Sequence, residues 1–511
     1  MSTYISTVVG KGRAVKAARD LEPGEEIMLE KPSCFVVRTI YCKSHCFSCT
    51  LELDQMSSPC SKCDLVSFCD SCQDAKKDHG NFCYLATFIP EIANQYSVDI
   101  DLLLFLAKAI SDPNTSVILR DATSEFENEQ KIENFKSTKN WELINQQCSG
   151  IMQLESHRSS ATAQWIRAVF NASESLIKLA KESNNCLIEA DTVVRLALIV
   201  NSNAYGLGDI AGKNRDIGFG VFPFASLFNH SCRPNCMFTG DVNGKMSIRV
   251  LHSVHQNEEL CFSYIDLYQG RESRQEELER TKHFSCNCER CIEPLPASFD
   301  RYIDGLLCQS DFCQKNIAAA GVVLPPGLLD DSGTSTNVMQ AVLSGATVAV
   351  DLQSPSCQIC CLTCSNQWIQ EISKGAQETV DNIQILLNGN ACSAFDVLEL
   401  LTLFVDKFKK KLHQHHALML KAHCWLVQCY RDIGDWRKAT TSCVQVIRTM
   451  RQVLPTNHFE LADYYFVLGD ILNKKGESKK SIEAFRKCHK IRSICCGPNH
   501  PRTLILLEHL K

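Results

Sequence analysis

Residues 217–236 read IGFGVFPFASLFNHSCRPNC, and residues 257–266 read NEELCFSYID. The first stretch is apolar and aromatic until NHSCRPNC interrupts it, and the second passes from a polar turn into a strand. Between them, MSIRVLHSV alternates as a half-buried strand does. Strands this short predict a compact, mostly β unit with small sheets rather than a doubly wound sheet, and no P-loop or Gly-x-Gly-x-x-Gly follows any of them.

Three cysteines, Cys286, Cys288 and Cys291, stand within six residues just beyond this unit. Such close spacing is typical of zinc ligands, but a tetrahedral site needs four of them. The fourth thiolate must therefore come from elsewhere in the chain, and Cys232 in NHSC is the candidate.

A second cysteine-rich segment, residues 46–83, holds ligand-type residues in four consecutive pairs. These are Cys46 with Cys49, Cys60 with Cys63, Cys69 with Cys72, and His79 with Cys83. Eight ligands suffice for two tetrahedral zinc ions, and metal binding would supply the folding energy of a segment too short to bury much apolar area. Free buried thiols would not account for four pairs in succession. Cys42 lies near enough to compete with Cys46.

A looser group of cysteines follows. Cys308 and Cys313 form one pair, and Cys361 and Cys364 form another after a long loop. Two such pairs predict a zinc ribbon, and the alternative is that they are ordinary buried cysteines.

Length and charge bound the class of protein. At 511 residues the chain is too long for one core, and its net charge of −5 argues against a chain-wide basic surface for nucleic acid. No run of about 18 apolar residues predicts a membrane span, and residues 1–20 lack the apolar core of a signal peptide. We therefore expect a reducing compartment, cytoplasmic and/or nuclear, in which metal thiolates account for the thirty cysteines better than disulfides.

The remaining segments are helical in pattern. Residues 84–195 carry apolar residues at helical spacing, apart from a polar and charged stretch within them. Near the C-terminus, His416, His458 and His500 are 42 residues apart, and Gly434 and Gly476 keep the same period. Each unit predicts a helix, a Gly-centred turn and a second helix, with the histidines at a turn or helix start. The pattern resembles an extended tetratricopeptide repeat.

The motifs together resemble a known family. NHSC, NEELCFSYID and the Cys-x-Cys-x2-Cys motif occur in the order of the SET methyltransferase fold with its post-SET zinc site, and the paired cysteines of residues 46–83 resemble a MYND zinc finger. With VGKGRAV and LEPGEEIMLEKP near the N-terminus, the chain is similar to the SET and MYND domain family of protein lysine methyltransferases from residue 4 to about residue 296.

This resemblance implies an α+β multidomain protein: a β-rich SET fold with a pseudoknot, an inserted MYND finger, a post-SET zinc site and C-terminal TPR-like helical repeats. The expected division is 1–45 N-terminal SET part, 46–83 MYND finger, 84–195 helical linker and SET insertion, 196–268 SET core, 269–296 post-SET, 297–395 cysteine-containing connector and 396–511 helical repeats.

The resemblance also implies the cofactors, S-adenosylmethionine and zinc. In the family, the first and third cysteine pairs hold one ion, and the second pair with His79 and Cys83 holds another. Cys232 with the three post-SET cysteines would hold a third ion, and the looser group a fourth. Two residues separate Cys69 from Cys72, where the family usually has three.

For S-adenosylmethionine, the resemblance implies binding residues that lie far apart in the sequence. They are Gly10, Lys11, Gly12, His157, Asn201, Asn229, His230, Tyr264 and Phe284. Tyr264 would be the catalytic residue, with its hydroxyl beside the transferred methyl group. Phe284 would stack on the adenine, while Asn229 would contact the cofactor's amino group.

Two departures leave the activity open between two hypotheses. Asn203 and Lys282 stand where the family commonly has aromatic walls of the lysine channel. Either the chain methylates lysines of histone and/or non-histone proteins, or it is a weak or inactive scaffold that binds partners. Proline-rich peptides or co-regulator proteins would bind through the MYND finger and the repeats. We expect a monomer that neither enters a membrane nor binds nucleic acid directly.

Overall fold

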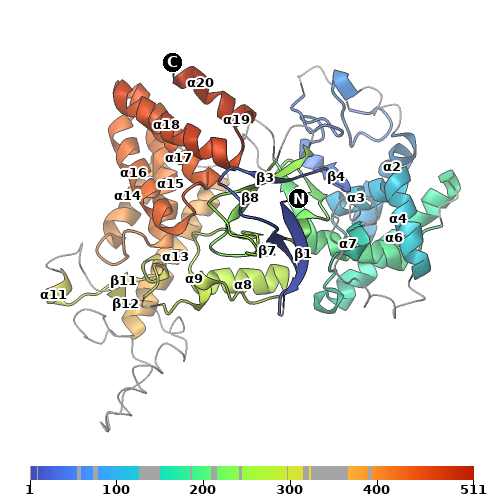
Figure 1. Ribbon diagram of the computed structural model, residues 1–511, viewed down its shortest axis with the longest axis horizontal. Coiled ribbons are helices and arrows are strands. Elements are labelled where there is room, and N and C mark those ends of the chain that lie inside the picture. The colour runs from blue at the N-terminus through green and yellow to red at the C-terminus, as the bar shows by residue number, and fades with distance from the viewer. Residues whose placement is uncertain are drawn as a thin grey trace, which may run out of the picture.

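Small β-sheets form the centre of the protein, as the computed structural model shows (Figure 1). It describes residues 2–8, 10–53, 59–72, 79–125, 150–184, 187–208, 216–240, 244–295, 297–314, 322–323, 366–388 and 394–510. The two-stranded sheets are β1 (Thr3–Val8) with β2 (Gly12–Ala17), β7 (Asn229–His230) with β10 (Cys261–Phe262), and β11 (Leu306–Leu307) with β12 (Val322–Val323). The three-stranded sheets are β3 (Glu26–Glu30), β9 (Met246–Val250) and β8 (Cys236–Gly240), and β4 (Cys34–Val37), β6 (Gly218–Val221) and β5 (Ala204–Leu207).

The N-terminal strands pair with strands that follow a long insertion. β3 pairs with β9, and β4 pairs with β6, both antiparallel. Residues separated by some 200 positions thus form one β unit, whose buried core includes Val15, Phe222 and Ile248. The mostly β unit with small sheets, expected from the sequence, is confirmed.

The insertion contains the cysteine-rich segment and a group of helices with its own core. These helices are α2 (Gly80–Tyr96), α3 (Ile100–Ser111), α4 (Pro113–Glu125), α6 (Ala163–Asn184) and α7 (Ala190–Asn203). Phe47 of the cysteine-rich segment stacks on Phe82 of α2, with ring centroids 5.2 Å apart. Phe105 of α3 stacks on Phe219 of β6, so aromatic contacts join the insertion to the sheets.

No single helix among the described residues is long and apolar enough to cross a membrane. The helix pair Ile100–Ser111 and Pro113–Ala122, which is bent, has the length and apolar composition of a span only when the two helices are taken together.

Helices dominate the part after β10. They are α8 (Arg271–Lys282), α9 (Glu289–Ile292), α10 (Asp300–Ile303), α11 (Asp311–Gln314), α13 (Asn366–Asn388), α14 (Ala394–Phe408), α15 (Ala417–Asp432), α16 (Trp436–Val453), α17 (Phe459–Lys474), α18 (Ser478–Cys495), α19 (Pro501–Leu504) and α20 (Leu506–His509). In Figure 1, the C-terminal helices lie on one side of the sheets and α2 to α7 lie on the other.

The predicted helical repeat is present. α15 and α16 form one hairpin and α17 and α18 the next, with Gly434 and Gly476 at positive φ in the turns. His416, His458 and His500 each precede a helix, and their side chains accept a hydrogen bond from the backbone two residues on. The period of 42 residues therefore places an N-cap in every unit.

The repeats also contact the β unit. The Asn457 side chain donates to the carbonyl oxygen of Leu251 at 2.7 Å, and His500 Nε2 lies 3.1 Å from the carbonyl oxygen of Gly240. His500 Nδ1 accepts from the Arg502 backbone, so in neutral His500 the Nε2–H donates to Gly240. The capping histidine therefore also joins the array to the end of β8.

We predict that Gly469→Ala destabilises the repeats by about 1–3 kcal/mol, because a Cβ there would lie 2.7–2.8 Å from ring atoms of Phe485. Gly375→Ala in α13 is the control, since a Cβ there would meet nothing within 4 Å and Ala favours helix by about 0.5–1 kcal/mol. Scanning calorimetry should show a lowered transition temperature for the first variant alone. A transition temperature of Gly469→Ala equal to that of wild type would contradict the close packing of α17 on α18.

Candidate active site and metal-ligand clusters

Four cysteines from two distant segments meet beside the β unit. The sulfur atoms of Cys232, Cys286, Cys288 and Cys291 all lie within 4.8 Å of one another. Cys232 follows β7, while Cys288 precedes the short helix α9 and Cys291 lies within it. The backbone N–H of Cys232 donates to Cys288 Sγ, and that of Cys288 donates to Cys286 Sγ. Four thiol ligands at this separation suit a tetrahedral zinc ion, and Cys232 stands where the missing fourth ligand was expected.

The cysteine-rich segment forms two further clusters. Cys46, Cys49, Cys69 and Cys72 make one, and Cys60, Cys63, His79 and Cys83 make the other. Alternate pairs along the chain therefore share a cluster, as the resemblance implies, and the short spacing between Cys69 and Cys72 does not prevent it. Each cluster offers four nitrogen or sulfur donors, which suits zinc.

The other cysteines stand apart from these groups. Cys42 is buried but belongs to none of the three clusters found among the described residues. Cys308 and Cys313 are buried too, and Cys308 contacts the Ser310 hydroxyl. Cys361 and Cys364 lie outside the described residues, so the zinc ribbon stays a prediction.

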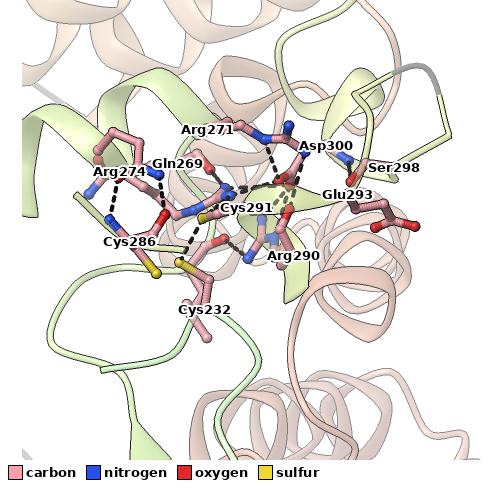
Figure 2. A network of polar contacts seen from close by, with 12 residues as sticks. Cys232, Gln269, Arg271, Arg274, Cys286, Arg290, Cys291, Glu293, Ser298 and Asp300 are labelled. Atoms are coloured by element: carbon pink, nitrogen blue, oxygen red, sulfur yellow. Dashed lines mark hydrogen bonds and ion pairs between the residues drawn. The ribbon is translucent and has the colours of Figure 1, made fainter. Parts of the chain in front are cut away.

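A buried network of arginine and aspartate adjoins the post-SET cluster (Figure 2). Asp300 of α10 binds Arg274 of α8 at 2.7 Å and Arg290 of α9 at 2.6 Å, and Arg271 lies 3.9 Å away. Arg274, fully enclosed, also reaches Cys291 Sγ at 3.8 Å. Burial alone would raise the pKa of Asp300, but Arg290 and Arg274 hold it below its ordinary value.

The charges of the two groups would balance if the cluster held zinc. A zinc ion with four thiolates would carry a net charge of minus two, and the three arginines with one aspartate carry plus two. Because buried charge is costly unless it is compensated, the arginines favour the fully deprotonated cysteine set. Arg274 and Arg290 also donate to the carbonyl oxygens of Gln269 and Leu267, so the network holds the chain that follows Tyr264.

Tyr264 is fixed from two directions. Its hydroxyl donates to the carbonyl oxygen of Phe228 at 2.5 Å, and its backbone N–H donates to His230 Nδ1 at 3.0 Å. Neutral His230 must then carry its proton on Nε2, which lies 3.2 Å from Cys232 Sγ. Burial lowers the pKa of His230 to about 4, in keeping with the neutral form. His230 therefore links Tyr264 directly to the cysteine cluster.

The parallel pairing of β7 with β10 makes this arrangement possible. Cys261 lies opposite Asn229, and Phe262 lies opposite His230, so Tyr264 follows β10 directly beside the NHSC motif. Glu30 of β3 accepts hydrogen bonds from the backbone N–H groups of Phe224 and Ala225, just before β7. The burial of this carboxyl raises the pKa of Glu30 to about 7.

Glu259 joins the glycine turn to Asn229. Its carboxylate accepts from the Asn229 side chain at 2.8 Å and from Lys11 Nζ at 2.9 Å. The flanking residues Gly10 and Gly12 have φ of +78° and +75°, and a Cβ at either would meet nothing within 4 Å. The turn therefore leaves backbone open to a ligand beside Asn229. Glu259 was not selected from the sequence, although it lies inside the NEELCFSYID motif.

Other predicted cofactor residues gather at the ends of α7 and α8. The Phe284 ring lies 6.1 Å from that of His230 and 6.4 Å from that of Tyr264. The His157 ring packs on His283 at 4.9 Å. Asn201 is exposed in the last turn of α7. The structure brings Phe284 to the tyrosine, whereas Asn201 makes no hydrogen bond or ring contact with the other predicted cofactor residues that the structure describes.

Asn203 and Lys282, the two residues that depart from the aromatic pattern of the family, differ in their contacts. Asn203 turns back to donate to the carbonyl oxygens of Glu155 and Ile199. Tyr205, two residues on, instead packs its ring against Phe262, next to Tyr264. Tyr205, which the sequence did not single out, therefore places an aromatic ring one side chain away from Tyr264. Lys282 does stand over the ring of Tyr264, at 5.7 Å from its centroid.

Comparisons with known proteins agree with this geometry. The SET domain family matches residues 12–265. The histone-lysine N-methyltransferase ASHR1 of Arabidopsis thaliana is 21% identical over 97% of this chain and 92% of the plant protein. Mouse histone-lysine N-methyltransferase Smyd1 is 24% identical, over 57% of this chain and 56% of its own length. A SET and MYND domain-containing protein of Dictyostelium discoideum is 24% identical, over 59% of this chain and 85% of its own length.

The residues that match the SET domain family include the β7–β10 pairing and Tyr264, and the four-cysteine cluster adjoins them. With two further clusters inserted between β4 and α2, the chain is similar to histone-lysine N-methyltransferases and to a SET and MYND domain-containing protein. The mouse relative extends well beyond the shared region, since this chain spans about half of its length.

We predict that Arg274→Met weakens metal retention by the post-SET cluster, because it removes one of the buried positive charges beside four thiolates. Breaking such a network costs about 3–5 kcal/mol. A chromophoric chelator should withdraw one zinc equivalent faster from this variant than from wild type. Arg280→Met, at an exposed position of the same helix, is the matched control. Equal release rates would contradict the charge balance.

Proposed function

We propose that the chain transfers a methyl group from S-adenosylmethionine to a lysine side chain of another protein. The observation that carries this proposal is the joint fixation of Tyr264 by Phe228 and His230, beside the open backbone of the glycine turn. S-adenosylmethionine, when bound, supplies an electrophilic methyl group on its sulfonium. The residues present fit such a ligand, since Gly10 and Gly12 leave room and Phe284 offers a ring beside His230.

Tyr264 would act by position rather than by removing a proton. Burial raises the pKa of Tyr264 above its ordinary value, so its hydroxyl stays protonated, and that proton is committed to Phe228. The lone pairs of the oxygen remain free to accept a hydrogen bond from an incoming amine. Holding the amine in line with the methyl group accounts for much of the rate of such a displacement. Tyr205 and Phe262 exclude water behind it.

Asn229 would hold the cofactor's amino group, as its side chain is fixed by Glu259 beside the glycine turn. Zinc would be structural: the post-SET ion would hold Phe284 and the end of α8 against the site, and two ions would order the MYND finger. We also propose a fourth zinc ion, which Cys361 and Cys364 would bind together with Cys308 and Cys313.

The substrates within this proposal are lysines of histone and/or non-histone proteins. The MYND finger and the repeats would recruit proline-rich or co-regulator proteins to a monomeric enzyme in the cytoplasm and/or nucleus.

We predict that wild-type, zinc-loaded protein binds S-adenosylmethionine in calorimetry and that Asn229→Ala weakens binding at least about tenfold. One hydrogen bond to a charged group is worth about 1.5–3 kcal/mol. Asn473→Ala, at an exposed position of α17, should bind as wild type does. If folded, zinc-loaded wild type does not bind, the enzyme proposal is wrong and the scaffold hypothesis stands.

We also predict that Tyr264→Phe retains cofactor binding but lowers kcat by about 10²-fold, because the amine loses its positioning oxygen. Methyl transfer to a mixture of histones and cell proteins measures this. An unchanged kcat would remove Tyr264 from the reaction.

A further inference from the structure

A lysine of the chain itself stands beside the proposed catalytic tyrosine. Lys282 is the last residue of α8, and its Nζ donates to the carbonyl oxygen of Ser202 at 2.8 Å, in the last turn of α7. The same nitrogen lies 5.7 Å from the ring centroid of Tyr264. The side chain thus spans from one helix end to the other across the face of Tyr264.

The bonding of this ammonium group is incomplete. An ammonium carries three donors, yet Ser202 is its one hydrogen-bond acceptor, and no carboxylate pairs with it, within the part of the chain that the structure describes. The side chain is half-buried, so water can reach part of it while the end of α7 and the Tyr264 ring cover the rest. Burial lowers the pKa of Lys282, which raises the share of neutral amine. A neutral amine is the form of lysine that can accept a methyl group.

Local backbone fixes the direction of the side chain. His283 follows in the left-handed conformation with φ of +60°, and its N–H closes α8 on the carbonyl oxygen of Glu279. Phe284 then reaches Tyr264 from the same turn. Lys282 and Phe284 therefore converge on one ring, while His283 between them packs on His157.

A capping role explains only part of this. A cation at the end of α7 would favourably contact its terminal carbonyl groups. An arginine would serve that purpose and stay charged. Capping does not account for a half-buried primary amine held over the ring of Tyr264.

We propose that Lys282 is an internal methyl acceptor of this enzyme, so that the chain methylates itself at the position where the wall of the lysine channel is expected. The proposal rests on the proposed function. The amine first loses a proton to solvent, and its lone pair attacks the methyl carbon of S-adenosylmethionine. The carbon–sulfur bond breaks and its electron pair stays on sulfur, giving S-adenosylhomocysteine. The reaction needs no other reactant, and tethering gives it a high effective concentration.

Methylation would change how Lys282 is held. Each methyl group removes one N–H donor, and the trimethylated form has none, so the bond to Ser202 is lost while the positive charge remains. A methylated ammonium over the Tyr264 ring is favoured by the cation–π interaction. Complete methylation would therefore free the side chain from α7 and alter the wall that an incoming lysine passes.

The test uses the full chain, zinc-loaded, incubated with S-adenosylmethionine that carries a trideuterated methyl group. Peptides from cleavage at acidic residues are then analysed by mass spectrometry, since methylation blocks cleavage at lysine and deuterium excludes methyl groups acquired during expression. We expect the label at Lys282, at a rate independent of protein concentration. Lys282→Arg should abolish this label, and Tyr264→Phe should slow it. Arg280→Lys offers an exposed lysine two residues away, which should stay unlabelled.

The other outcomes overturn the inference in distinguishable ways. If the same preparation binds the cofactor and labels added proteins but leaves Lys282 unlabelled, self-methylation is wrong and the proposed function stands. A rate that rises with protein concentration shows transfer between molecules and removes the internal geometry. If calorimetry shows no cofactor binding, the proposed function fails first. If the cofactor binds and no lysine anywhere is labelled, both proposals of transfer fail.

Discussion

The site depends on a short parallel contact, that of Asn229 and His230 with Cys261 and Phe262. Two residues on each strand cannot hold two distant segments together by hydrogen bonding alone, because a single such bond contributes only about 1 kcal/mol net. The contact persists because neighbouring groups support it. Phe228 and Phe262 stack behind it, Glu30 holds the chain before it, and Cys232 anchors the chain after it.

The post-SET cluster extends that support to the rest of the protein. Its segment has few apolar residues to bury, so a zinc ion held by the four cysteines, together with the arginines beside them, would supply much of its order. His230 connects the cluster to Tyr264, and Arg274 and Arg290 connect it to the residues that follow Tyr264. Through Asp300 the same network reaches α10, ahead of the repeats. A displacement of the four cysteines would therefore shift Tyr264 and also α10, which precedes the C-terminal helices.

Local signals in the sequence predicted the features that depend on local geometry. The ligand pairs, the capping histidines such as His416 and the turn glycines such as Gly434 follow from spacing, since each acts within a few residues. Contacts between distant segments could not be predicted in this way. Glu259 is an ordinary turn carboxylate until folding places it between Lys11 and Asn229, and Arg274 is one charge among many on α8 until the cysteines surround it. The hydrogen bonds of the Asn203 side chain to the carbonyl oxygens of Glu155 and Ile199, and the packing of Tyr205 on Phe262, likewise depend on the folded chain.

The C-terminal helices are part of the same construction rather than an appended module. Asn457 and His500 bond to the ends of strands, and the backbone of Ile494 in α18 lies against Gly24, just before β3. Because β3 pairs with β9 and carries Glu30, which holds the chain before Asn229, the array supports the sheet that supports the site. Such an array cannot move as a rigid body without disturbing these bonds. A displacement of α18 would therefore alter the contacts of β3 and β9, and with them the support of the chain before Asn229.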